Sequence, residues 1–210
     1  PGARVGTCSA RRTAQVLAAR PDVSIVPLRG NVPTRIDRVV RGELDAIVLA
    51  RAGVSRLGLD AHVTEVLPLD RVLPAPAQGA LAVQCRADDR ELAALLTVLD
   101  DDAARGAVEA ERTLLHALRG GCLVPVGAFA REHTGGFLLT AGVFGVAPTR
   151  SVRVEVAGAD PRELGESAAA ILLDRGAGEI LNAFNRTARI PAPGAAELAV
   201  AGVVDRQESR

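Results

Sequence analysis

Short apolar runs alternate with amphipathic stretches along the first 57 residues, and this alternation restricts the fold more than any other feature of the sequence. The pattern predicts strands at residues 3–7, 23–28 and 45–50, and helices at about 10–20, 35–41 and 52–57. Pro21 and Gly42 follow the first two helices, as helix-stopping residues do. Strands separated by helices in this way favour an open α/β sheet that binds ligands at the ends of its strands.

A proline-rich segment, residues 67–77, follows this alternation and predicts an extended crossing segment that could serve as a hinge. The remaining pattern predicts strands at 81–85, 123–131, 137–145 and 151–156, and helices at 89–99, 100–118, 161–175 and 177–184. The last three strands and their helices indicate a smaller α+β unit with a three-stranded antiparallel sheet. Residues 186–210 are aperiodic and rich in proline and alanine, so we expect a flexible tail there.

Charge and composition narrow the class of protein. The 25 basic residues balance 25 acidic ones, so no overall field favours nucleic acid or a membrane as a partner. No apolar run approaches the length of ~18 residues that a spanning helix needs, and three cysteines form no disulfide framework. We therefore expect a cytoplasmic protein. The sequence contains no methionine and begins at Pro1, which leads us to expect a missing N-terminal portion.

All of the basic residues are arginines, and they are enriched in the first third of the chain, where residues 1–73 hold eleven arginines against seven acids. Five of them follow predicted strands: Arg11, Arg12, Arg29, Arg35 and Arg56. If the strands are parallel neighbours, these side chains converge on one cleft, where guanidinium groups pair with carboxylates. Ser9 is a suitable N-cap for the first helix, whose free N–H groups could bind an anion. The alternative is that each arginine is a solvated surface residue.

Cys122 follows Gly120-Gly121 and precedes an apolar run, a setting that could present its thiol on an open loop as a point of covalent attachment. A buried cysteine that packs as a small hydrophobe is the simpler alternative. A cysteine hydrolase is a third reading, in which His116 activates the thiol. The three histidines lie too far apart in the sequence for zinc-ligand spacing, so we expect no metal site.

Five motifs carry a family resemblance. They are Val5-Gly6-Thr7-Cys8-Ser9-Ala10-Arg11-Arg12, Leu28-Arg29-Gly30-Asn31-Val32, Leu57-Gly58-Leu59, Pro76-Ala77-Gln78-Gly79-Ala80 and Gly120-Gly121-Cys122-Leu123-Val124-Pro125-Val126-Gly127. In order and spacing the sequence resembles porphobilinogen deaminase, also called hydroxymethylbilane synthase, from residue 4 to about residue 184.

The resemblance implies a transferase of tetrapyrrole biosynthesis, which condenses four porphobilinogen units head to tail with loss of ammonia. It implies that Cys122 carries the dipyrromethane cofactor through a thioether. Further cofactor contacts implied by the matching motifs are Thr7, Ser9, Arg11, Arg12 and Arg35. The implied contacts to substrate are Arg29, Arg56 and Gln78.

The sequence also departs from the family pattern. Cys8 replaces a serine, and Pro33 replaces a glycine, which we expect to stiffen the loop before Arg35. The family's catalytic aspartate has no counterpart, so we expect no catalytic residue in this chain and no turnover by it alone.

The expected domains are an α/β domain with a periplasmic-binding-like fold and an arginine-lined cleft (1–77), a return segment that belongs with the missing domain (78–101), an α+β domain that carries the cysteine (102–185) and the tail (186–210). The resemblance implies a monomer for the complete enzyme. The main alternative function is a non-catalytic, anion-binding α/β module of the periplasmic-binding type.

Overall fold

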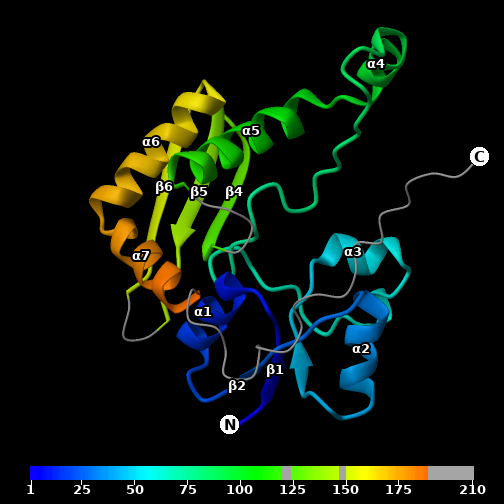
Figure 1. The fold of residues 1–210 in the computed structure, drawn as a ribbon, viewed down its shortest axis with the longest axis vertical. Helices are drawn as coiled ribbons and strands as arrows, with labels where there is room; N and C mark the ends of the chain where they lie inside the picture. The colour runs from blue at the N-terminus through cyan, green and yellow to red at the C-terminus, as the bar shows by residue number, and fades with distance from the viewer. Residues whose placement is uncertain (120–123, 147–149, 189–210) are drawn as a thin grey trace, which may run out of the picture.

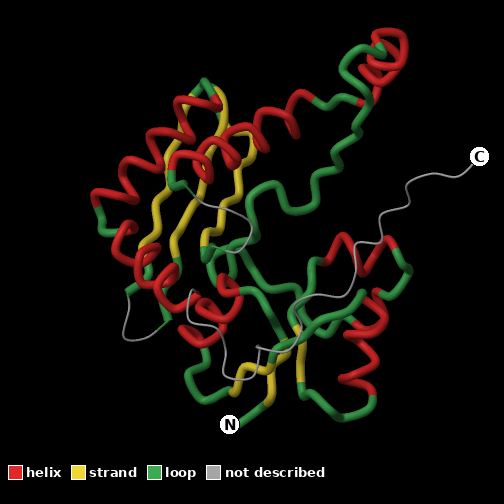
Figure 2. The backbone as a smooth tube through the Cα atoms, in the orientation of Figure 1, coloured by secondary structure: helices red, strands yellow, loops and turns green. Residues whose placement is uncertain are grey.

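The computed structural model describes residues 1–119, 124–146 and 150–188, and within them the chain forms two α/β layers joined by a long linking segment (Figure 1). The first layer is a small parallel sheet with helices α1 to α3. The second is an antiparallel sheet with α5, α6 and α7 packed on it. Figure 2 shows that the segment between the two layers is mostly loop, and that α4 lies at its far end, away from both sheets.

The first sheet has the strand order β2-β1-β3, and all of its neighbours are parallel. Its strands are β1 (Arg4–Gly6), β2 (Ser24–Val26) and β3 (Ala46–Ile47). The crossover helices are α1 (Ala10–Ala19) and α2 (Val32–Val40), and α3 (Arg51–Arg56) follows β3. The predicted alternation of strand and helix is therefore confirmed, although β3 is shorter than the apolar run at 45–50.

Glycine is required at the end of β1, because a Cβ atom on Gly6 would lie 2.7 Å from Leu44 and 2.9 Å from Leu28. Both leucines are buried, and they close the sheet beneath the loop that follows β1. This packing fixes the point at which the chain turns toward Ser9 and α1.

Side-chain caps start the first two helices. Ser9 caps α1, as predicted, and its hydroxyl accepts from the Arg12 amide at 3.4 Å. Asn31 caps α2 and accepts from the Thr34 amide at 2.9 Å. Because of this cap α2 begins at Val32, three residues before its expected start, and Pro33 lies in its first turn, where proline is well tolerated. The expectation that Pro33 stiffens a loop was therefore wrong.

The second layer is the larger core. It contains β4 (Val126–His133), β5 (Gly136–Val143) and β6 (Val152–Gly158) in an antiparallel meander, which confirms the predicted three-stranded sheet. Its helices are α5 (Asp102–Ala117), α6 (Pro161–Asp174) and α7 (Ala177–Ala188). Helix α7 extends through the first residues that we expected in the tail; residues 189–210 lie outside the described part.

Helix α5 crosses α6 and the sheet at very short range. A Cβ atom on Gly165 of α6 would lie 2.5 Å from the carbonyl oxygen of Ala110, and one on Gly106 of α5 would lie 2.3 Å from the ring of Phe137. Leu114 of α5 and Leu139 of β5 are completely buried in this core. The layer is therefore closely packed.

The linking segment begins after a 3-10 turn, η1 (Asp60–His62), and residues 63–80 form neither helix nor strand. Residues 67–77, expected to be an extended crossing segment, form neither helix nor strand, but turns at 69–71 and from 76 onward interrupt the extended chain. The strand expected at 81–85 is not formed, because no strand of the described chain lies beside it to complete its hydrogen bonds. Helix α4 (Arg90–Leu96) and the 3-10 turn η2 (Thr97–Leu99) occupy the predicted helix at 89–99.

Buried hydrogen bonds hold the linking segment between the layers. The Leu73 amide donates to Oε1 of Gln15 at 2.8 Å, and the Leu73 carbonyl accepts from Nε2 of Gln15 at 3.2 Å and from the Arg11 guanidinium. On the other side, the carboxylate of Glu111 accepts from the Ala77 amide at 2.5 Å and the Ala130 amide at 2.7 Å. Helix α1 and helix α5 therefore both bind the same short stretch of chain.

Candidate functional site

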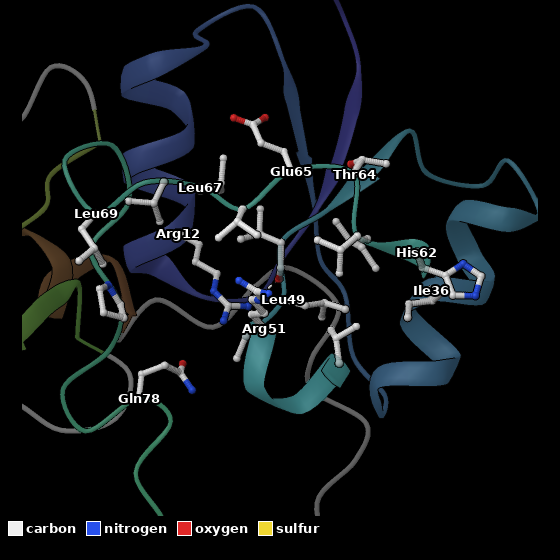
Figure 3. Close-up of a pocket in the computed structure, with 18 of the residues that line it drawn as sticks. Arg12, Ile36, Leu49, Arg51, His62, Thr64, Glu65, Leu67, Leu69 and Gln78 are labelled. Atoms are coloured by element: carbon white, nitrogen blue, oxygen red, sulfur yellow. Dashed lines mark hydrogen bonds between the residues drawn. The ribbon is translucent and has the colours of Figure 1, made fainter. Parts of the chain in front are cut away.

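A cavity of about 270 Å³ opens at the carboxyl end of the parallel sheet, between α1, α3 and the linking segment (Figure 3). Most of its wall is aliphatic: Ile36, Ile47, Val48, Leu49, Ala50, Val54, Val63, Val66, Leu67, Leu69, Val72 and Pro74. The polar residues on its wall are Arg11, Arg12, Arg51, His62, Thr64, Glu65 and Gln78. The cavity therefore combines an apolar body with several guanidinium groups.

The topology explains why the cavity forms here. Strand β1 is central and both neighbours run parallel to it, so the segments that follow β1 and β3 leave the sheet at the same edge. The first of these segments leads into α1, which carries Arg12, and the second runs through Val48 to α3. The linking segment then passes over this edge and covers it with Val63 to Leu69.

Arg12 is the arginine best placed to meet a ligand in the cavity. Its Nη1 donates to the Val48 carbonyl at 2.6 Å, which fixes the guanidinium at the end of the sheet. Burial, and secondarily the positive charge of Arg35, lowers the pKa of Arg12 below its ordinary value. A guanidinium carries five N–H donors, so the contact to Val48 leaves donors for a carboxylate.

Arg11 lines the same cavity but is directed into the protein. It is buried, and its guanidinium donates to the Leu73 carbonyl. Burial, together with the neighbouring charge of Arg12, lowers the pKa of Arg11 to about 10, so the group stays protonated at neutral pH. Within this structure Arg11 joins α1 to the linking segment and contributes positive charge to the cavity wall.

Thr7 and Ser9 form the turn that leads into α1. Thr7 is buried, and its hydroxyl oxygen accepts from the Ser9 amide at 3.1 Å. Neither residue lies on the cavity wall. The exposed Cys8 between them accepts a hydrogen bond from the Leu28 amide at its Sγ, at 3.1 Å. These residues therefore shape the loop beside the cavity.

The expected convergence of five arginines is only partly realised, since Arg11 and Arg12 line the cavity but the other three do not. Arg35 donates through Nε to the Gly30 carbonyl at 2.7 Å, and Arg29 and Arg56 are exposed. Parallel strands bring loops to one edge, but they do not determine the direction of each side chain. Gln78, a predicted substrate contact, does line the cavity, whereas Cys122 lies outside the described residues.

Arg51 and Glu65 belong to the cavity wall and were not among the predicted site residues. Arg51 follows β3 closely, as Arg29 follows β2, and this shared position was the signal in the sequence that could have identified it. Glu65 forms a long ion pair with Arg71, at 3.9 Å between Oε1 and Nη1. No sequence pattern distinguishes Glu65 from a surface acid.

Neither a metal-binding cluster nor a membrane-spanning helix is present among the described residues. Residues 1–119, 124–146 and 150–188 contain no group of three or more histidine, cysteine or acidic side chains that could hold a metal ion. Within the same residues no helix has the length and apolar character needed to cross a membrane.

Comparisons with known proteins match nearly all of the described chain. Residues 1–94 match the family model described as "Porphobilinogen deaminase, dipyromethane cofactor binding domain", and residues 106–174 match "Porphobilinogen deaminase, C-terminal domain". Porphobilinogen deaminase of Desulforudis audaxviator is 51% identical over 182 residues, and that of Brevibacillus brevis is 46% identical over 181. Each match covers 86% of this chain and 59% of the relative, so the chain spans about three-fifths of the length of these relatives.

Proposed function

The chain belongs to the porphobilinogen deaminase family, and from this premise we propose that it provides the cofactor-holding part of a hydroxymethylbilane synthase. That transferase condenses four porphobilinogen units head to tail, with loss of ammonia, in tetrapyrrole biosynthesis. The proposed substrate is porphobilinogen and the proposed cofactor is dipyrromethane, bound covalently to Cys122.

The observation that carries the proposal is the guanidinium of Arg12 at the end of an aliphatic cavity. A pyrrole that bears an acetate and a propionate is a flat apolar ring with two carboxylates, so it matches such a wall. The apolar residues exclude water from the ring, and a desolvated guanidinium binds a carboxylate more strongly than one in bulk water. The residues present therefore fit one pyrrole ring of the dipyrromethane that the family model's description names.

The chain's own groups have distinct roles in this proposal. Arg12 binds a ligand carboxylate, and Arg11 keeps α1 against the linking segment so that Arg12 stays in place. Ser9 caps α1 beside the cavity. The proposal also includes the contacts that the resemblance implies: to the cofactor from Thr7 and Arg35, and to the substrate from Arg29, Arg56 and Gln78. Bound dipyrromethane supplies the primer onto which pyrrole units are added. Cys122 would hold this group through a thioether: its sulfur would form a C–S bond to the hydroxymethyl carbon of hydroxymethylbilane, and the hydroxyl would leave as water with the proton of the thiol, so that the two linked pyrroles next to the sulfur make up the dipyrromethane.

We propose the same division of the chain as the sequence suggests: an α/β domain over 1–77 with a periplasmic-binding-like fold, a return segment over 78–101, an α+β domain over 102–185 and a tail over 186–210. The proposal includes a cytoplasmic location, a monomeric complete enzyme and no nucleic-acid partner. No residue of this chain matches the family's catalytic aspartate. We therefore propose that this chain holds the primer but does not itself synthesise hydroxymethylbilane.

Intact-mass spectrometry tests the attachment. After incubation with hydroxymethylbilane, the purified chain should gain the mass of a whole number of linked pyrrole units, and Cys122→Ser should not. Cys8→Ser is the matched control, because Cys8 is an exposed thiol near the start of the sequence, and this variant should still gain the mass. An unmodified chain would contradict the proposal and favour the anion-binding α/β module.

A further inference from the structure

We propose that Arg51 is a ligand-binding residue of the cavity and that it binds one carboxylate of a pyrrole whose other carboxylate is bound by Arg12. The inference rests on the proposed function and deepens it. No motif of the sequence that carries the family resemblance includes Arg51.

The position of Arg51 is the first argument. It is the first residue of α3, directly after the segment Val48 to Ala50 that forms one wall of the cavity. Arg12 reaches the same wall from α1 through its hydrogen bond to the Val48 carbonyl. Figure 3 shows the two side chains in the same part of the cavity, between Leu49 and Gln78. Two guanidinium groups from different elements thus face one small space.

Arg51 also has no partner among the residues that the structure describes. Across residues 1–119, 124–146 and 150–188 its side chain forms no hydrogen bond or ion pair, whereas Arg11 and Arg12 each donate to a backbone carbonyl. Glu65, the acidic residue on the cavity wall, is paired with Arg71 instead. As far as residues 1–119, 124–146 and 150–188 are concerned, all five N–H donors of Arg51 are therefore available to a ligand.

The size of the cavity indicates which ligand two arginines would bind. A volume of about 270 Å³ lies just below the range of ~300–1,000 Å³ typical of pockets for small organic ligands. Such a space accommodates one substituted ring rather than a chain of several. A single pyrrole with an acetate and a propionate offers one carboxylate to each guanidinium, so Arg12 and Arg51 together would select a dicarboxylate over a monocarboxylate.

Isothermal titration of the 210-residue chain with porphobilinogen tests this role. Arg51→Gln should weaken binding about tenfold, equivalent to ~1.4 kcal/mol, and Arg51→Lys should recover part of the loss because it keeps the charge. The dimethyl ester of porphobilinogen should bind the original chain and Arg51→Gln equally weakly. Arg90→Gln is the matched control: Arg90 is likewise an exposed first residue of a short helix, but it lies in α4, away from the cavity.

Each outcome has a defined meaning. If Arg51→Gln binds porphobilinogen as tightly as the original chain, the role of Arg51 is wrong and the proposed function is untouched. The role is also wrong if Arg90→Gln weakens binding to the same extent, since the effect would then be one of net charge. If the original chain shows no affinity for porphobilinogen, the assignment of the cavity to substrate fails as well. Thermal unfolding by circular dichroism should give the same midpoint for the original chain and the variants, which controls for loss of folding.

Discussion

Glu111 is the buried carboxylate of the described chain, and it joins three elements through two hydrogen bonds. One carboxylate oxygen accepts from Ala130 of β4 and the other from Ala77 of the linking segment. Ala77 has φ of 61°, in the left-handed region that a residue with a Cβ atom rarely adopts. Glu111 thus stabilises an unfavourable backbone conformation at the end of the linking segment.

Stability should depend on pH through Glu111. Burial raises the pKa of Glu111 above its ordinary value of 4.5, although the two N–H donors oppose the shift. Between the ordinary pKa and the raised one, the folded chain holds a proton that the unfolded chain has lost. The contribution of Glu111 to the free energy of unfolding is therefore fully present below pH ~4.5, and it is lost as the pH rises through the raised pKa of Glu111 in the folded chain. Urea unfolding at a series of pH values measures the free energy of unfolding.

Glu111→Gln should abolish this pH dependence and lower the free energy of unfolding by about 1–3 kcal/mol, because the amide NH2 group must face one of two N–H donors. Glu109→Gln is the matched control on the same helix, since Glu109 pairs with Arg162 at the surface and should change stability by less than ~1 kcal/mol. Identical pH profiles for both variants would contradict the role of Glu111.

At the scale of single residues, the sequence predicted those contacts that depend on neighbours along the chain. The Ser9 cap was predictable because the hydroxyl bonds an amide three residues away. The direction in which an arginine side chain points could not be predicted in this way, because Arg11 donates to Leu73, which lies 62 residues further along the chain. Arg12 and Gln78 lie at the cavity, whereas Arg51 was not identified, because it falls between the strand predicted at 45–50 and the helix predicted at 52–57.

At the scale of elements, helices were easier to predict than strands in the linking segment. A helix satisfies its own backbone hydrogen bonds, so α4 forms close to its predicted place although none of its residues is buried. A strand needs a neighbour, and residues 81–85 have none among the described residues. The apolar pattern of those residues therefore leaves Leu81 and Val83 exposed.

Helix α4 and the turn η2, which follow residues 81–85, should behave as an exposed apolar surface. Leu95 and Val98 are 66% and 80% exposed on α4 and η2. Replacing both with serine should reduce the fluorescence of a bound hydrophobic dye such as ANS, and it should change the free energy of unfolding by only about 0.5 kcal/mol. The control Leu114→Ala in the core should cost about 2–5 kcal/mol. Unchanged dye binding by the double variant would contradict this prediction.

At the scale of the whole molecule, Arg153 of β6 connects the second layer to the first. Its guanidinium donates to the carbonyls of Asp70 at 2.5 Å and Arg71 at 3.1 Å, and to Oε1 of Gln15 in α1 at 3.1 Å. It also lies 5.1 Å from the ring centroid of Phe144, within range of a cation–π contact. Figure 1 shows β6 and α1 in the two different layers that this side chain joins.

Arg153→Ala should therefore loosen the junction without unfolding either layer. We expect amide hydrogen exchange to accelerate at residues 70–74 and the free energy of unfolding to fall by about 2 kcal/mol, because three hydrogen bonds from a charged donor are lost. Arg131→Ala is the matched control, since Arg131 is an exposed arginine on β4, the other outer strand of the same three-stranded sheet. Exchange at 70–74 that is equally fast in both variants would contradict this assignment.

The two layers could be predicted separately, but their arrangement could not. Alternation of strand and helix specifies a parallel sheet, and three apolar runs with Gly-containing turns specify an antiparallel meander. The contacts that join them come from a few polar side chains, among them Gln15, Arg153 and Glu111, and nothing in their local sequence marks their partners.

Helix α1 has ten residues and carries two neighbouring arginines with different contacts. Arg12 lies at the cavity, and Arg11 donates a hydrogen bond to Leu73 in the linking segment. A substitution that rotates or shifts this helix alters both at once. A substitution in α1 that changes what the cavity accepts therefore also changes the contact between α1 and the linking segment. Variation that changes ligand preference is more readily tolerated at Arg51, which no other part of the described chain depends on for its position.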